Sequence, residues 1–318
     1  MPSLFRLLAG AAFAAALALQ SGCTTTPAAP AAAAEAVRLD ATPRIAVISA
    51  FQPELVLLLA RIEQPRKHLV NGIEFTTGRL QGKPVVVFLS GVSMTNAAMT
   101  TQLALNRFNI THIVVSGIAG GVNPNLRIGD VTVADKWGQY LEVLAARETA
   151  PGRFQPPGFM RDATLPNFGM WHPRPVEVRS AGRTGTERKF WFEADPAMLQ
   201  VAARLPETTT LERCDPQRRC LTQAPRVVVG GTGVSGSAFV DNATLREYTF
   251  KTFQANVLDM ETAAIAHVAY ANSVPYIAFR SLSDLAGGGE GENEMGTFLR
   301  IAADNSARVL LAFLAAWK

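Results

Sequence analysis

Cysteine and histidine are scarce in this sequence, which has three cysteines and four histidines among 318 residues. The histidines stand alone, and no two of them have the spacing of a zinc site. Two cysteines in one polar loop, without a histidine nearby, also supply too few metal ligands. We therefore expect no metal centre. The four histidines are His68, His112, His172 and His267.

Runs of like charge and long apolar segments are also absent. Thirty Lys and Arg face 26 Asp and Glu, a net charge of +4, and they form no basic run. We therefore expect no nucleic-acid-binding surface. The apolar stretch Leu7–Leu19 is too short to predict a membrane span. The composition, 48% hydrophobic and 18% charged, is that of a globular protein, and the length suits one large α/β domain or two small ones.

The N-terminus has the features of a targeting segment. Arg6 is the only charged residue before Cys23, and the apolar stretch ends in Leu19-Gln20-Ser21-Gly22-Cys23. This resembles a bacterial lipoprotein signal with Cys23 as the lipidated residue. The resemblance implies a signal peptide over 1–22, export to the periplasm, and membrane attachment only through the lipid. Export with cleavage at another small residue is the alternative. Residues 23–43, rich in Ala, Pro and Thr, predict a flexible tether.

The two remaining cysteines flank a short polar loop. Cys214 and Cys220 enclose Asp215-Pro216-Gln217-Arg218-Arg219. In an oxidising compartment such a pair favours a disulfide, which would close this loop. Two unlinked surface thiols are the alternative.

Acidic residues follow three predicted strands. Glu54 comes after the apolar run 44–50, at the start of a predicted helix over 55–62. Glu261 and Asp284 end the strands of a predicted βαβ unit, with strands over 256–258 and 276–279 and a helix over 262–270. Ligands bind at this edge of an open α/β sheet. Each acid alone has a simpler explanation, as a helix-dipole partner or a turn residue. Together, at matched strand ends, they indicate a site.

Glycines mark two further segments. Ser116–Gly121 follows a predicted strand over 113–115 and allows a ligand close to the backbone, although a plain tight turn explains it equally. Gly231, Gly233 and Gly236 match G-x-G-x-x-G, but the third glycine does not open a helix. Asp241 is instead the expected N-cap, so we do not predict a dinucleotide site. Residues 138–195, interrupted by prolines, predict a long insertion with little sheet, and long loops are usually lids or contacts.

Taken in order, five motifs resemble the nucleoside phosphorylase/nucleosidase superfamily, and most closely its bacterial 5′-methylthioadenosine/S-adenosylhomocysteine nucleosidases. They are the first strand with Glu54, the Ser116–Gly121 glycines, Ser235–Val240 (SGSAFV), Asp259–Val268 (DMETAAIAHV) and Arg280–Ala286 (RSLSDLA). The resemblance implies one α/β domain over 44–318, with a mixed central β-sheet flanked by helices. It also implies a purine nucleoside as substrate, no cofactor, and a homodimer or higher homo-oligomer.

The resemblance also implies a role for each site residue. The family's general base, which activates water, falls on Glu54, the acid that protonates the purine on Asp284, and the arginine beside the water on Arg280. The family's ligand for the ribose hydroxyls falls on Glu261, with Met260 packing under the sugar. The remaining binding positions, around the base and near the sugar, fall on Phe239, Val240, Ala119, Gly120 and Ser90. Ile118 departs from the family, which has a small hydroxyl residue at this position.

Three carboxylates suit the cleavage of an N-glycosidic bond. The reaction passes through an oxocarbenium-like state, and the purine leaves poorly unless an acid protonates it. A nucleoside phosphorylase is the first alternative, but phosphorolysis needs arginines around a phosphate, and only Arg280 is near these positions. A non-catalytic nucleoside-binding or storage-like protein on the same fold is the second, favoured by export and by Ile118. We expect the 138–195 insertion to cover the sugar's 5′ end or a subunit contact, and not the purine.

Overall fold

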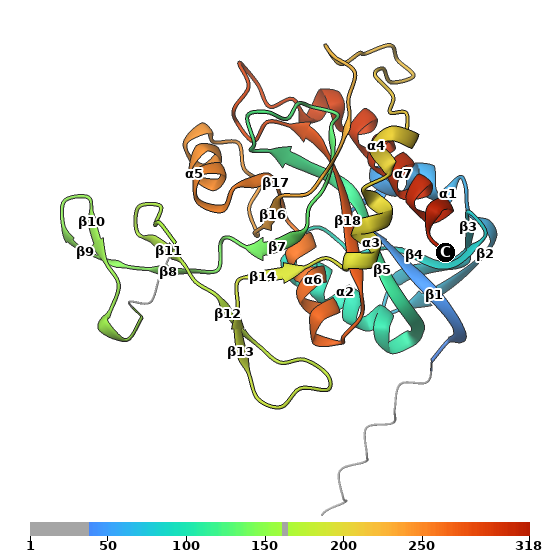
Figure 1. Cartoon of the computed structure of the whole chain (residues 1–318), viewed down its shortest axis with the longest axis horizontal. Helices are drawn as coiled ribbons and strands as arrows, with labels where there is room; N and C mark the ends of the chain where they lie inside the picture. The colour runs from blue at the N-terminus through green and yellow to red at the C-terminus, as the bar shows by residue number, and fades with distance from the viewer. Residues whose placement is uncertain (1–37, 161–164) are drawn as a thin grey trace, which may run out of the picture. The chain divides into compact units, whose positions relative to one another are not determined.

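A mixed β-sheet forms the centre of the molecule (Figure 1). The computed structural model describes residues 38–160 and 165–318, and over these residues the sheet has 12 strands. Its main path runs through β14 (Trp191–Glu193), β7 (Lys136–Gln139), β16 (Thr232–Ser235), β17 (Ala255–Asp259), β5 (Phe108–Gly121), β1 (Asp40–Ser49), β4 (Lys83–Leu89), β3 (Ile73–Leu80) and β2 (Glu63–Val70). Off this path, β18 (Tyr276–Asp284) pairs with β5 and β6 (Val131–Val133), and β6 pairs with β15 (Val227–Val229).

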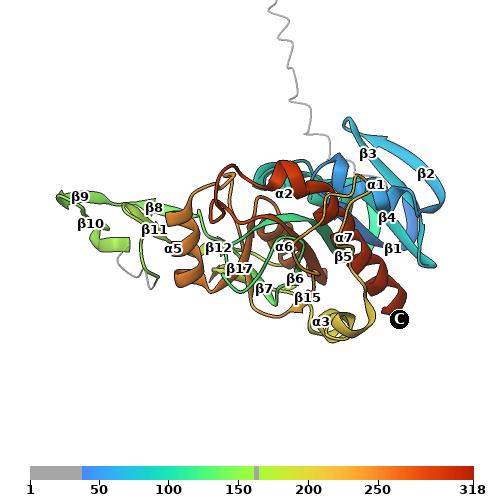
Figure 2. The same cartoon turned by 90° about the horizontal axis from the view of Figure 1, so that it is seen from above.

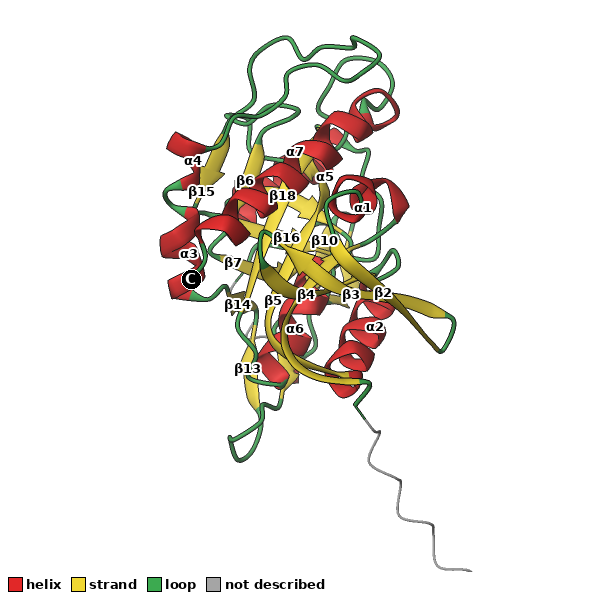
Figure 3. Cartoon of the chain, turned by 90° about the vertical axis from the view of Figure 1, so that its right-hand side faces the viewer, coloured by secondary structure: helices red, strands yellow, loops and turns green. Residues whose placement is uncertain are grey.

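Helices cover both faces of this sheet, as expected for the predicted single α/β domain (Figure 3). Because side chains alternate along a strand, β1 feeds two cores. Ala46 and Ile48 belong to the core on the side of α2 and α6, whereas Ile45 and Val47 belong to the core on the side of α1 and α7. The helices are α1 (Gln52–Leu59), α2 (Met94–Arg107), α3 (Pro196–Ala202), α4 (Leu205–Thr208), α5 (Ala243–Phe253), α6 (Thr262–Ala271) and α7 (Met295–Ala316).

Strand β5 changes partners along its length, and this brings the predicted motifs together. Residues 113–119 of β5 pair with β18 in parallel, and Gly120 and Gly121 pair with β17 in antiparallel register. Gly120 faces Leu258 of β17 and also Asp284 of β18. The Ser116–Gly121 segment is therefore strand, not the turn that its glycines predict. The predicted βαβ unit is likewise not a parallel crossover, because β17 and β18 run in opposite directions along β5.

Several other sequence expectations are corrected. β1 begins at Asp40 and so includes residues 40–43 of the predicted tether. β2 is an unpredicted strand, and the N-cap of α5 is Asn242, not Asp241. The predicted signal peptide and Cys23 fall on residues 1–37, outside the described residues. No helix in the described ranges has the length and hydrophobicity needed to cross a bilayer.

The glycine-rich G-x-G-x-x-G segment packs closely against protein. It begins in the turn between β15 and β16, spans β16 and ends directly after it. A Cβ on Gly233 would lie 2.6 Å from Cε2 of Trp137, a fully buried side chain. Close packing of β16 on Trp137 therefore explains a glycine at this position.

The 138–195 insertion contains more strand than its prolines predict. It includes β14 and three two-stranded ribbons, and the two ribbons formed by residues 143–155 and 171–173 lie at the end of the molecule away from β2 and β3 (Figure 2). The hydroxyl of Tyr248 on α5 donates to the carbonyl of Pro166 at 2.7 Å, and the rings of Tyr248 and Phe168 lie 5.0 Å apart. The ribbons pair β8 (Val143–Ala145) with β11 (Trp171–Pro173), β9 (Arg147–Ala150) with β10 (Arg153–Gln155), and β12 (Val176–Val178) with β13 (Glu187–Lys189).

Candidate active site

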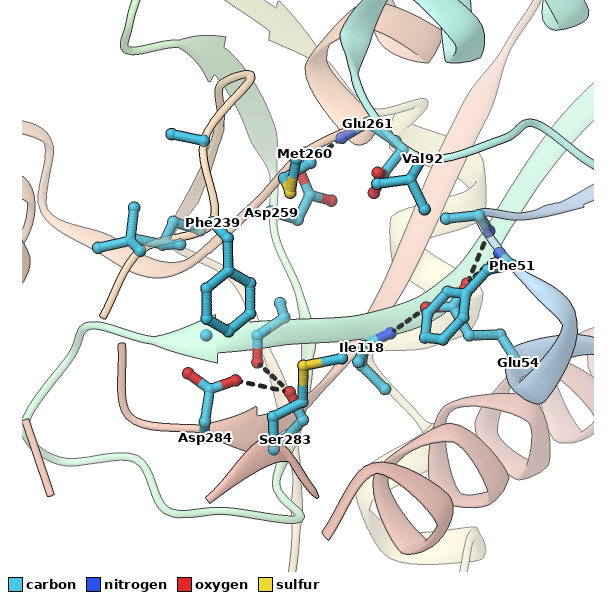
Figure 4. A pocket seen from close by; sticks show the side chains of 17 residues that line it. Phe51, Glu54, Val92, Ile118, Phe239, Asp259, Met260, Glu261, Ser283 and Asp284 are labelled. Atoms are coloured by element: carbon cyan, nitrogen blue, oxygen red, sulfur yellow. Dashed lines mark hydrogen bonds between the residues drawn. The ribbon is translucent and has the colours of Figure 1, made fainter. Parts of the chain in front are cut away.

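One pocket lies where β5, β17 and β18 end, and the N-terminal end of α1 closes one side of it (Figure 4). Glu54, Glu261 and Asp284 all line it, as the sequence predicts. Asp284 and Phe239 lie at one end, and Glu54 and Phe51 at the other (Figure 4). The described part of the 138–195 insertion contributes no residue to the lining, and its predicted place over the sugar's 5′ end or at a subunit contact stays a prediction.

Glu54 is held by main-chain donors from two elements. Its carboxylate accepts the N–H of Ala50 at 2.6 Å and the N–H of Ile118, on β5, at 2.7 Å. Pro53 in the first turn of α1 lets the helix start directly after β1, which turns Glu54 back toward the strand end. The side chain is 1% exposed, and burial raises the pKa of Glu54 against the lowering effect of Arg280 and the N–H donors.

Arg280 lies behind the pocket and joins its carboxylates. Its Nε is 2.8 Å from Oδ2 of Asp259, its Nη2 is 3.3 Å from Oε2 of Glu261, and its Nη1 is 3.7 Å from Oε1 of Glu54. Burial alone would lower the pKa of Arg280, but the three carboxylates raise it. Arg280 is absent from the lining of the pocket and lies among the carboxylates, and its predicted place beside the water stays a prediction.

Gly117 makes this arrangement possible. A Cβ at this position would overlap both Nη1 of Arg280 and the carboxylate of Glu54. Gly117 is thus required by the close approach of a buried ion pair, and not by a turn.

Glu261 is fixed from two sides. Its Oε1 accepts the N–H of Ser93, before α2, at 2.9 Å, and its Oε2 contacts Arg280. Burial raises the pKa of Glu261 to about 7, with Arg280 opposing this shift and Asp259 adding to it. Asp259 accepts the N–H of Glu261 at 3.2 Å and hydrogen bonds from the hydroxyls of Ser235 and Thr262, which shapes the turn into α6.

Asp284 has neutral hydrogen-bond partners only. The hydroxyl of Ser283 donates to its Oδ2 and the N–H of Ala286 to its Oδ1, both at 2.8 Å. Among the described residues, no Lys or Arg forms an ion pair with it. Burial raises the pKa of Asp284, the neutral donors lower it, and Glu294 raises it further. A carboxyl with a raised pKa holds its proton to a higher pH than an ordinary aspartic acid does, which suits a general acid.

The other predicted residues divide into two groups. Met260, Val240, Ala119, Gly120 and Phe239 line the pocket, and Phe239 remains 59% exposed, so its ring face is available to a ligand. Ser90 does not line it. Its hydroxyl donates to the carbonyl of Gly91 at 2.9 Å, and its predicted binding role stays a prediction.

Sequence reasoning missed several lining residues. Phe51, Val92, Asp259, Ser283 and Met295 belong to the wall. Asp259 stands at a strand end like Glu261 and was open to the same argument. Met295 begins α7, which no motif connects to this site.

The fold and the pocket together identify the family. A model of the Phosphorylase superfamily matches residues 44–315, and the chain belongs to that superfamily. The chain is 28% identical over 272 residues to the 5′-methylthioadenosine/S-adenosylhomocysteine nucleosidase of Bacillus licheniformis, covering 85% of this chain and 98% of that protein. It is 29% identical over 272 residues to the enzyme of the same description from Geobacillus thermodenitrificans, covering 85% and 96%.

Solved structures show the same fold. The 5′-methylthioadenosine/S-adenosylhomocysteine nucleosidase of Neisseria meningitidis, in complex with methylthio-immucillin-A, matches with a TM-score of 0.63 at 24% identity. That match covers 86% of this chain and 99% of the other. The futalosine hydrolase of Helicobacter pylori matches with a TM-score of 0.61 at 20% identity, over 86% and 97% of the two chains.

Proposed function

We propose that this protein hydrolyses the N-glycosidic bond of purine nucleosides, of the 5′-methylthioadenosine or S-adenosylhomocysteine type, and releases the free base. The observation that carries the proposal is the set of three carboxylates around one pocket, in two different electrostatic settings. Membership of the superfamily and the relatives with this activity agree with it.

Asp284 delivers the proton that the departing purine needs. A purine anion is a poor leaving group, and a carboxylic acid with a raised pKa at the base end of the pocket supplies a proton to N7. Phe239 stacks on the base, and the main chain at Val240 contacts it.

Glu54 and Glu261 act on the sugar. Glu54 activates the water that attacks the anomeric carbon, and the N–H groups of Ala50 and Ile118 keep its carboxylate in place. Glu261 accepts hydrogen bonds from the ribose hydroxyls, with Met260 packed under the ring. Charge develops on the sugar in the transition state, so anionic groups beside it lower the barrier.

Arg280 is a positioning residue in this scheme. It contacts Glu54, Asp259 and Glu261 at once, and so fixes the distance between the water site and the ribose site. Phosphorolysis would need cations facing the ligand. In the described part of the chain, no Lys or Arg lines the pocket, which favours water over phosphate as the nucleophile.

A binding protein without turnover is the second candidate. Ile118 lines the pocket beside Glu54, where a small hydroxyl residue would help to hold the water. An apolar side chain at this point weakens the water site and favours this reading.

The deciding experiment incubates the purified protein with 5′-methylthioadenosine, S-adenosylhomocysteine, adenosine and inosine, with and without phosphate. Free base is measured by chromatography, and binding by calorimetry. Base release that does not depend on phosphate supports the nucleosidase, and strict dependence on phosphate supports a phosphorylase. Nucleoside binding without release of free base supports the non-catalytic binding protein.

We further propose that the chain is exported and held at a membrane by a lipid on Cys23. The Cys214–Cys220 disulfide, predicted from the sequence and present in the structure, suits an oxidising compartment. Cys23→Ser should move the protein from the membrane to the soluble periplasmic fraction. Parent protein that is already soluble would contradict the anchor.

Assembly into a homodimer or higher homo-oligomer is also part of the proposal. Val92 at the pocket and Met99 on α2 are 44% and 67% exposed, and exposed apolar side chains of this kind favour a contact. Analytical ultracentrifugation tests it, and a monomer at micromolar concentration would contradict it.

A further inference from the structure

Ser93 has the most unusual backbone of any non-glycine residue in the described ranges. Its φ is 87° and its ψ 154°, whereas the other non-glycine residues with positive φ lie between 50° and 62°. The latter values belong to the left-handed helical region, but the Ser93 values belong to a region that glycine occupies almost alone. Strain of this kind persists only where surrounding contacts hold it, and such positions cluster at active sites.

The hydrogen bonds of Ser93 are those of a pocket residue, not those of an ordinary helix cap. A serine at an N-cap usually accepts an N–H of the first turn with its hydroxyl. Ser93 stands at the N-cap of α2 but makes no such bond. Its hydroxyl instead lies 3.1 Å from the hydroxyl of Ser237, two residues before Phe239. Its N–H donates to Oε1 of Glu261 at 2.9 Å.

These two bonds connect three parts of the pocket. Val92, which directly precedes Ser93, lines the pocket on one side, and the segment with Phe239 lines it on another. Glu261 lies between α2 and Arg280, so its two carboxylate oxygens have donors on opposite sides, Ser93 for Oε1 and Arg280 for Oε2. A carboxylate held in this way has one orientation, which is what selective binding of a diol needs.

We propose that Ser93 is a positioning residue, whose strained main chain aims the Glu261 carboxylate at the ribose hydroxyls while its hydroxyl fastens the Phe239 segment. The inference rests on the proposed function for the identity of the ligand. It adds that recognition of the ribose hydroxyls depends on a backbone conformation outside the carboxylate cluster.

Two substitutions at Ser93 separate the main chain from the hydroxyl. Ser93→Gly accepts the observed φ and ψ and removes only the hydroxyl. Ser93→Thr keeps a hydroxyl, but a β-branched residue does not accept this conformation, so the N–H turns away from Glu261. Ser237→Ala is the matched control, because it removes the same hydroxyl contact and leaves residue 93 unchanged.

The readout compares a ribonucleoside with its 2′,3′-dideoxy analogue. Ser93→Thr should raise KM for the ribonucleoside at least tenfold and leave the dideoxy analogue within about twofold of the parent, because only the ribose hydroxyls use Glu261. Ser93→Gly should lose no more than Ser237→Ala does, and should unfold at or above the parent's temperature. Equal losses on both substrates in Ser93→Thr, or none on either, would overturn the proposal.

A second measurement leaves Ser93 itself unchanged. In the parent, the amide proton of Ser93 should shift with pH as Glu261 titrates, and this shift should vanish in Glu261→Gln. The charged groups that face Glu261 are Arg280, Asp259 and Glu54, so Glu54→Gln serves as the reference for indirect effects. A Ser93 amide resonance that does not shift with pH would refute the contact with Glu261.

Failure of the proposed function gives a different result. If no nucleoside loses its base, the same substrate pair is compared by calorimetric binding to the parent and to Ser93→Thr. A selective loss of ribonucleoside binding would still support positioning by Ser93, and unchanged binding of both would refute it.

Discussion

The two ends of the pocket hold their carboxyl groups in different ways. At one end Glu54, Asp259 and Glu261 surround a single buried guanidinium. At the other end Asp284 has a hydroxyl and an N–H as partners, and among the described residues no Lys or Arg pairs with it. Burial raises the pKa of the carboxyls at both ends, but only beside Arg280 does a cation oppose this rise. In the proposed reaction the carboxyls beside Arg280 serve the sugar, and Asp284 serves as the acid for the base.

Removing the proton at the base end should have the largest effect. Asp284→Asn keeps the shape and some hydrogen bonding but delivers no proton, so kcat should fall by about 10²–10⁴-fold. Steady-state kinetics measures the fall, and calorimetry with free adenine checks that binding weakens far less. Near-normal turnover in this variant would remove Asp284 from the mechanism.

Removing the cation at the sugar end should act first on stability. Arg280→Met leaves three buried carboxylates without their partner, and unfolding in urea should show a loss of about 3–5 kcal/mol. Arg300→Met is the control, because the Arg300 side chain is 40% exposed and its pairing with Asp304 should contribute less than about 1 kcal/mol. Similar losses in the two variants would contradict the joining role of Arg280.

The pH dependence of stability should reveal Glu261. Its folded pKa of about 7 lies above the ordinary value of 4.5, so the folded protein keeps a proton that the unfolded chain releases. Stability from this group is therefore fully present below pH 4.5 and is lost as the pH rises to about 7. Thermal unfolding should show this decline in stability with rising pH in the parent protein and not in Glu261→Gln. Parallel curves would show that Glu261 is ionised throughout.

The smallest change tests the neutral partner of Asp284. Ser283→Ala removes a hydrogen-bond donor to the carboxylate. The activation free energy should rise by about 0.5–1.5 kcal/mol, so kcat should fall by less than about 15-fold. The lost bond favoured the charged form, so the pKa of Asp284 should rise and the alkaline limb of the rate profile should move to higher pH. A limb that stays in place would mean that another group limits the rate.

The sequence predicted the two ends of the site but not their electrostatic difference. Glu54, Glu261 and Asp284 stand after apolar runs, and strand ends meet at one edge of the sheet, so their convergence followed from local pattern and family resemblance. The arrangement around Arg280 did not follow, because it depends on how β5 and β18 pair. Nor did the place of Ser90 outside this pocket, where its hydroxyl donates to the carbonyl of Gly91 in its own loop.

The fold, too, was predicted only in part from the sequence. The apolar run at 44–50 predicts a buried strand, and the structure confirms it in β1. The short ribbons of the 138–195 insertion escaped prediction, because strands of three or four residues among prolines carry little periodic signal. β2 escaped because its residues are mostly exposed and charged, as in many edge strands.

Gly120 belongs to two ladders at once, with Leu258 on one side and Asp284 on the other. These partners lie more than 100 residues further along the chain, so the base end of the pocket exists only after its most distant segments have met. Contacts of this separation form late, because the loop they close carries a large entropic cost. Chains that refold from denaturant should thus recover helical signal before they recover activity, and base release should report the completely folded protein.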